Sequence, residues 1–185
     1  MDQVVGCVNV WTPAIGAARL VDELGEDTAL ACLARLVTGE VPPGDLESPP
    51  WPLVVTLISG GKLPSFDFAS PRHGYWPRSW AARALAYVGD EDAAPWLAAA
   101  LEDGHWRVRM TAAQSIGRLR IRGLEPQLLS RLRDPHERVR AAAVTTLGRV
   151  GGDDVASRLE ELLEDESELV QDRVLVALRR VERDP

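Results

Sequence analysis

Two histidines, His105 and His136, come nearest in this sequence to a metal or catalytic site. They lie 31 residues apart in matching stretches of sequence, and we expect them about 10 Å apart, in adjacent turns, from the usual spacing of packed helices. A metal would need further carboxylate or histidine ligands on bonds of about 2 Å. The simpler interpretation is a polar turn residue duplicated with its surroundings, so we expect no metal site.

Arginine is the second residue type that could form a binding site. All lysine and arginine residues of the chain are arginine except Lys62. Arginine near a helix C-terminus is favoured by the helix dipole, but five within one short stretch exceed that need. Guanidinium groups bind carboxylates and phosphates through paired hydrogen bonds. We therefore predict an acidic or phosphate-bearing partner for this set: Arg118, Arg120, Arg122, Arg131 and Arg133.

Six tryptophans are many for a chain of 185 residues, and four of them lie between residues 76 and 106. Most are expected to fill gaps in the packing. Exposed tryptophan beside arginine is also typical of binding hot spots and of base-stacking surfaces. We therefore add Trp96, Trp106, His105 and His136 to the candidate partner-binding residues.

Catalytic motifs are missing from the sequence. It has no glycine-rich phosphate loop, no nucleophile elbow, no zinc-ligand spacing and no paired catalytic carboxylates. We accordingly predict no catalytic residues and no cofactor, and favour a protein without enzymatic activity.

The elements that would position these residues repeat with a period of 31. Val108, Val139 and Val170 mark successive copies. Apolar residues within a copy follow spacings of four, four and three, which indicates an amphipathic helix, and a second apolar stripe predicts a second helix in each period. Repetition on this scale means that one helix pair is copied and stacked. The sequence therefore predicts an all-α fold, an α-solenoid of stacked antiparallel helix pairs.

The copies read DGHWRVRMTAAQSIGRL, DPHERVRAAAVTTLGRV and DESELVQDRVLVALRRV, with a weaker first copy in WPRSWAARALAYVG. This pattern resembles the HEAT-repeat family, in the short form found in phycobilin lyase subunits, over about residues 76–182. The resemblance implies a solenoid fold. It says little about function, because such repeats serve scaffolds, adaptors, lyases and some nucleic-acid enzymes.

The resemblance also implies a ladder in which an aspartate that closes one unit pairs with the arginine that opens the next. Asp103 precedes Arg109 by six residues, and Asp134 precedes Arg140 by the same spacing. We therefore expect these four residues to be structural, with Gln171 replacing the arginine in the last copy. Three further arginines, beside the five above, are left without a role in the ladder: Arg107, Arg138 and Arg149.

The chain is expected to divide into two parts. Residues 76–185 would hold about three and a half repeats, and residues 1–75 an irregular helical cap. The cap contains two expected helices, a proline-rich linker and a long loop, in this order: 13–24, 27–37, 39–50 and 62–75. The apolar run 51–61 fits a short helix or a strand, and the all-α context favours a helix.

Charge and composition narrow the functional classes. The net charge is −7, but residues 71–150 carry +5 and the two flanking parts −6 each. An acidic chain with a basic middle disfavours nonspecific binding to nucleic acids or membranes. No apolar run approaches the ~20 residues that cross a bilayer, the start resembles no secretory signal, and two cysteines fit a reducing compartment. We expect a cytoplasmic protein.

Three functions remain open at this stage. The first is a non-catalytic scaffold or adaptor that binds another protein, because stacked helix pairs present an extended surface. The second is a DNA glycosylase similar to the HEAT-like alkylpurine glycosylases, which combine a basic groove with tryptophans and a catalytic aspartate; this chain is net acidic. The third is a lyase or cyclase acting on a small molecule, which follows only from the resemblance to bilin lyases.

Overall fold

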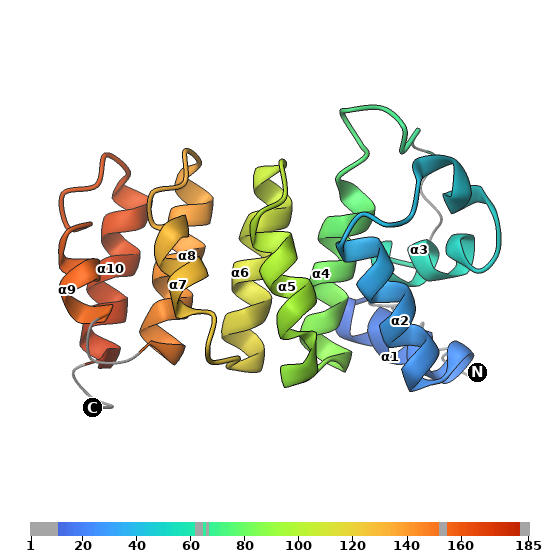
Figure 1. The fold of residues 1–185 in the computed structure, drawn as a ribbon, viewed down its shortest axis with the longest axis horizontal. Helices are drawn as coiled ribbons and strands as arrows, with labels where there is room; N and C mark the ends of the chain where they lie inside the picture. The colour runs from blue at the N-terminus through green and yellow to red at the C-terminus, as the bar shows by residue number, and fades with distance from the viewer. Residues whose placement is uncertain (1–10, 62–64, 66, 152–154, 182–185) are drawn as a thin grey trace, which may run out of the picture.

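The computed structural model of the protein describes residues 11–61, 65, 67–151 and 155–181. Within these ranges the chain forms ten α-helices and two short 3-10 helices, with no strand. The helices stand side by side in Figure 1, from the N-terminal helices on the right to α9 and α10 on the left. The predicted all-α solenoid is confirmed.

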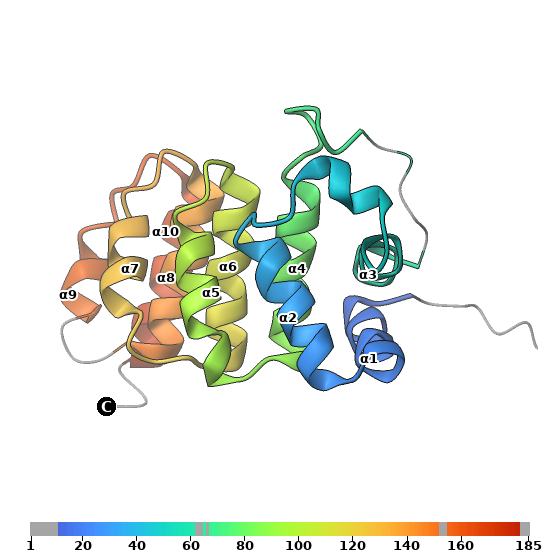
Figure 2. The same cartoon turned by 45° about the vertical axis from the view of Figure 1, so that its right-hand side comes forward.

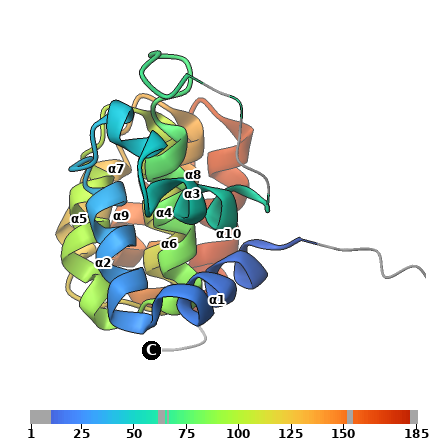
Figure 3. The same cartoon turned by 90° about the vertical axis from the view of Figure 1, so that its right-hand side faces the viewer.

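The repeats form two layers of helices. The long helices are α4 (Trp76–Val88), α6 (Trp106–Leu119), α8 (Glu137–Val150) and α10 (Glu168–Val181). The short helices are α5 (Ala94–Leu101), α7 (Glu125–Arg131) and α9 (Val155–Glu160). Each short helix packs mainly on the long helix that follows it, and successive long helices pack on one another. In Figures 2 and 3 the short helices lie on one side of the stack and the long helices on the other.

The apolar period explains both layers. Val108, Ala112 and Ile116 are fully buried in α6, since residues three or four apart share one face of a helix. Leu97 and Leu128 anchor the short helices in the same core. Leu163 lies one period after the buried Leu132 but departs from this pattern: α9 ends at Glu160, and Leu163 is 40% exposed.

Neighbouring long helices approach closely at one repeated position. A side chain at Gly148 would meet Ala177 of α10, with 2.6 Å between the two Cβ atoms, and Gly117 faces Thr146 in the same way. The Thr146 hydroxyl donates to the carbonyl of Ala113 at 2.7 Å. Ser115, one period earlier, donates to Ala82 in the preceding helix at 2.8 Å. Small residues thus allow contact, and buried hydroxyls fix the register of the helices.

Helices before the repeats cover one end of the stack. They are α1 (Pro13–Leu24), α2 (Glu26–Val37) and α3 (Trp51–Ser59), with a 3-10 helix at Pro43–Glu47 in the proline-rich linker. All three α-helices contact α4 (Figure 3). The ambiguous run from Trp51 is therefore helical, as expected, whereas residues 65 and 67–75 form neither helix nor strand.

Candidate partner-binding surface

An arginine–aspartate ladder runs along the edge where short helices turn into long ones, at the top of Figure 1. Arg109 binds the carboxylate of Asp134 through Nε at 2.7 Å and Nη2 at 2.8 Å. Arg140 makes the same bidentate contact with Asp165, through Nε at 2.9 Å and Nη2 at 2.8 Å. Arg78 likewise binds Asp103. Each arginine therefore reaches an aspartate 25 residues later, in the next repeat.

The expected pairing of Asp103 with Arg109 and of Asp134 with Arg140 is wrong in its side-chain partners. Across the six-residue spacing the arginine contacts only the main chain: Nη1 of Arg109 donates to the carbonyl of Asp103, and that of Arg140 to the carbonyl of Asp134. The planar guanidinium can donate hydrogen bonds from two of its edges. Nη1 therefore binds a main-chain carbonyl in the preceding turn, while Nε and Nη2 bind the aspartate of the next repeat. Gln171 keeps only the first contact, to the carbonyl of Asp165.

Asp134 is held as a carboxylate. Its side chain is 2% exposed, and that burial raises its pKa. The hydrogen bonds from Arg109 and from the main-chain N–H of His136, with the charge of Arg109, outweigh burial and hold the pKa of Asp134 below its usual value. Burial likewise raises the pKa of Asp165, but hydrogen bonds from Arg140 and from the main-chain N–H of Ser167, with the charge of Arg140, hold it below its usual value. These ion pairs therefore contribute stability above the ordinary aspartate pKa that is lost as pH falls below it.

The two repeated histidines cap helices. Nδ1 of His105 accepts a hydrogen bond from the main-chain N–H of Arg107, and Nδ1 of His136 accepts from that of Arg138. Their rings are stacked on aromatic side chains, His105 on Tyr75 with centroids 3.5 Å apart and His136 on Trp106 at 3.8 Å. Both histidines thus have structural contacts at the start of a long helix.

Burial of His105 should make the stability of the protein depend on pH. Burial lowers the pKa of His105, so between its folded and unfolded pKa values the unfolded chain binds more protons. Stability should therefore fall as pH drops below about 6.5, the unperturbed histidine value. His105→Asn keeps a capping side chain without a titrating ring, and its urea midpoint should change less than that of the wild type between pH 7.5 and 5. Parallel pH profiles would contradict this expectation.

Tryptophan and arginine side chains alternate beside these caps. The guanidinium of Arg107 lies 5.3 Å from the ring centre of Trp76 and 4.6 Å from that of Trp106. The guanidinium of Arg138 lies 5.8 Å from the ring centre of Trp106. These distances fit cation–π attraction. Trp106 is therefore half-buried between partners of its own chain, and Trp96 packs partly against the hydrophobic core.

Three of the long helices line a groove. A cavity of about 500 Å³ lies between α6, α8 and α10. Ala141, Ala142 and Thr145 of α8 line it, with Met110 of α6 and Leu169 of α10. Its other lining residues are polar or basic: Gln114, Arg138, Thr146, Arg149 and Arg173. None of the lining residues carries a carboxylate, and its three arginines form no ion pair within the described ranges. We name this the α6–α8–α10 groove.

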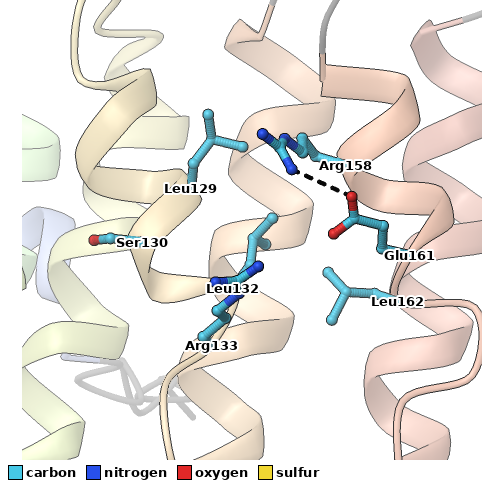
Figure 4. A pocket seen from close by; sticks show the side chains of 7 residues that line it. All are labelled: Leu129, Ser130, Leu132, Arg133, Arg158, Glu161 and Leu162. Carbon is cyan, nitrogen blue, oxygen red and sulfur yellow. Dashed lines mark hydrogen bonds and ion pairs between the residues drawn. The ribbon is translucent and has the colours of Figure 1, made fainter.

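A second cavity, of about 370 Å³, lies between α7 and α9 on the other layer (Figure 4). Leu129, Leu132 and Leu162 give it an apolar lining. Arg158 in this cavity is already paired with Glu161 at 3.2 Å. This cavity therefore offers less unpaired positive charge than the α6–α8–α10 groove.

A family comparison agrees with this geometry. The sequence model for the family described as HEAT repeats matches residues 75–125 and 113–179, which together cover more than half of the chain. The chain belongs to the HEAT-repeat family. No curated protein matches this HEAT-repeat chain. Among solved structures, the crystal structure of an engineered protein resembles its fold, with a TM-score of 0.50 and 16% sequence identity over 93% of this chain and 97% of that one.

The described part of the HEAT-repeat chain was compared with two kinds of feature, a membrane-spanning helix and a metal site. No helix there has the length and apolar character needed to cross a membrane. In the same ranges, no three residues among histidine, cysteine, aspartate and glutamate gather closely enough to hold a metal ion.

The five clustered arginines of the prediction are spread over different surroundings. Arg131 is bound to Glu102 and to the carbonyl of Leu101, so it joins α7 to the end of α5. Arg133 lines the cavity between α7 and α9, and Arg122 is exposed. Only Arg118 and Arg120 lie together, in a further cavity that is described below.

Four arginines that line cavities on the long helices were not among the predicted partner-binding residues: Arg138, Arg149, Arg173 and Arg180. A signal for two of them was present, because Arg118, Arg149 and Arg180 are spaced by the same 31 residues. The predicted arginines were those that lie close together in the sequence, within one repeat. Arginines at the same position of successive repeats are instead the ones that the stack brings together.

Proposed function

We propose that this HEAT-repeat protein is a non-catalytic interaction module that binds an acidic segment of a partner protein in the α6–α8–α10 groove. One observation carries the proposal. Arg138, Arg149 and Arg173 stand around a groove without a carboxylate, in a chain whose net charge is −7. Arginines without an ion pair among the described residues are well suited to carboxylates, which accept two parallel hydrogen bonds from one guanidinium.

The shape of the groove supports a peptide segment as the occupant. Alanine and threonine along α8 give a floor on which a backbone can approach closely, and Met110 and Leu169 offer apolar contacts at its sides. A segment with acidic and apolar side chains at alternating or helical spacing would satisfy both, as in other groove-binding peptides. Methionine also adapts its shape to different partners.

The uneven charge of the chain supports selectivity. Acidic surfaces elsewhere repel an acidic segment, so attraction is concentrated where arginines gather. Complementary charge of this kind raises association rates and makes binding depend on salt.

The test is selection from a library of random peptides, followed by affinity measurements with a labelled member. The enriched peptides should be acidic with interspersed apolar residues. Charge reversal at two groove residues, Arg138→Glu with Arg173→Glu, should weaken binding at least tenfold, because the acidic peptide would then be repelled by negative side chains where it was attracted by positive ones. The matched control is Arg72→Glu, which reverses an exposed charge outside the groove and should change the affinity less than twofold.

Two outcomes would overturn the proposal. One is enrichment of peptides without acidic residues, and the other is equal loss of affinity in the control and the groove variant. Binding of duplex DNA at low salt, abolished by the same groove variant, would instead favour the glycosylase-like alternative.

A further inference from the structure

A further cavity, of about 400 Å³, lies at the C-terminal ends of the long helices and shares only Arg149 with the lining of the α6–α8–α10 groove. Its lining consists of Gly117 and four arginines: Arg118, Arg120, Arg149 and Arg180. Arg118, Arg149 and Arg180 occupy the same position in three successive repeats. The stack of α6, α8 and α10 thus gathers positive charge from three helices around one hollow. We name it the arginine cavity.

The charge in the arginine cavity is not neutralised by the described part of the chain. Arg118 is held in place, since its Nε donates to the carbonyl of Ala86 and its guanidinium lies 4.2 Å from the ring centre of Tyr87. None of the four arginines forms an ion pair within the described ranges. Like charges around one hollow repel one another, so an anion placed among them would relieve that repulsion.

Helix capping explains part of this arrangement but not all of it. One arginine near the end of each long helix is favoured by the helix dipole. Arg120 is different: it follows the end of α6 with φ 55°, in the left-handed region. That position usually carries glycine, because a side chain there is strained. The chain thus accepts strain at the one residue that adds a second arginine from the same repeat.

We propose that the arginine cavity binds a phosphate group. A phosphate dianion offers several acceptor oxygens, and guanidinium groups bind it through paired hydrogen bonds with directional fit. Three of the arginines come from three helices and Arg120 follows the end of α6. A tetrahedral anion has enough oxygens for several of them, whereas a single carboxylate has only two oxygens to share. The group belongs either to a free phosphate compound or to a phosphorylated side chain.

The test uses the full chain with pyrophosphate and inorganic phosphate as probes, followed by calorimetry. Pyrophosphate should bind saturably with one site, and more tightly than inorganic phosphate because it carries more charge. Arg120→Gly should weaken pyrophosphate binding at least fivefold while the melting temperature stays equal or rises, since glycine accepts the left-handed conformation. Combining it with Arg180→Ala should bring the loss to at least thirtyfold. Arg122→Ala removes an exposed charge two residues away that does not line the cavity, and should change affinity less than twofold.

A second arm identifies the source of the phosphate. A peptide with one phosphoserine that displaces pyrophosphate, while its unphosphorylated form does not, would support the site with a phosphorylated side chain as its ligand. Displacement by neither peptide, with pyrophosphate binding retained, would support it with a free phosphate compound. Binding that does not saturate, or that Arg120→Gly and Arg122→Ala reduce equally, would overturn the proposal. Failure here leaves the groove proposal intact, because Arg120 and Arg180 do not line the groove and Arg138 and Arg173 do not line this cavity.

Discussion

Asp134→Ala should destabilise the protein by about 3–5 kcal/mol, the usual cost of removing one partner from a buried ion pair. Arg109 would keep its charge with only 11% of its side chain exposed, and would have no carboxylate to bind. The main-chain N–H of His136 would also lose its acceptor. Urea unfolding at pH 7, followed by circular dichroism, measures the loss.

A double-mutant cycle tells which arginine Asp134 pairs with. Asp134→Ala and Arg109→Ala should be strongly coupled, since each removes the same ion pair. Asp134→Ala and Arg140→Ala should be nearly additive, because Arg140 contacts only the main chain of Asp134. Glu161→Ala is the control: its pair with Arg158 is more than half exposed on both sides, and its loss should cost under about 1 kcal/mol. Stronger coupling with Arg140 would contradict the ladder described above.

Gly148→Val should separate α10 from α8, at a cost of about 3 kcal/mol, the upper end of the usual range for overpacking. The new Cβ would lie 2.6 Å from the Cβ and 2.9 Å from the Cα of Ala177, and a helix backbone cannot yield as a flexible side chain does. The pair α9 and α10 contacts the rest mainly through α8. Since repeat stability is close to a sum of neighbouring contacts, the last pair should open before the others.

Hydrogen exchange followed by mass spectrometry resolves this order of opening. Protection should fall most in peptides from α9 and α10 and least in α4 and α6. Gly104→Ala is the matched control, because a Cβ there has no atom within 4 Å, and its exchange pattern should equal that of the wild type. Uniform loss of protection along the chain would show that the repeats unfold as one unit instead.

The sequence predicted the stack well because its information is periodic. Val108, Ala112 and Ile116 recur at a fixed interval, and burial in a repeated helix pair is the physical reason for that recurrence. The grouping of helices was harder to predict. A period does not say where a repeat begins, and the structure joins each short helix to the long helix after it rather than to the one before it.

Partners across repeats could not be derived from spacing in the chain. Asp134 lies six residues from Arg140 and 25 from Arg109, so proximity in the sequence favours the wrong arginine. The direction in which Arg109 extends decides the pairing, and only the packed helices determine it. The arginine cavity escaped prediction for a related reason: Arg149 and Arg180 are far from Arg118 in sequence and meet through stacking alone.

The ladder gives the solenoid a polarity. Each repeat presents an arginine toward the next and an aspartate toward the one before, so every internal junction is the same donor–acceptor joint. If 31 residues were duplicated within the array, the new repeat would carry both the arginine and the aspartate of this ion pair, so no new kind of contact would be needed. At Gln171 that series stops, since the side chain closes its own turn and offers no guanidinium for a further aspartate. A repeat inserted within the array would thus gain the ion pair on both sides, whereas a repeat added after Gln171 would lack it unless an arginine replaced Gln171.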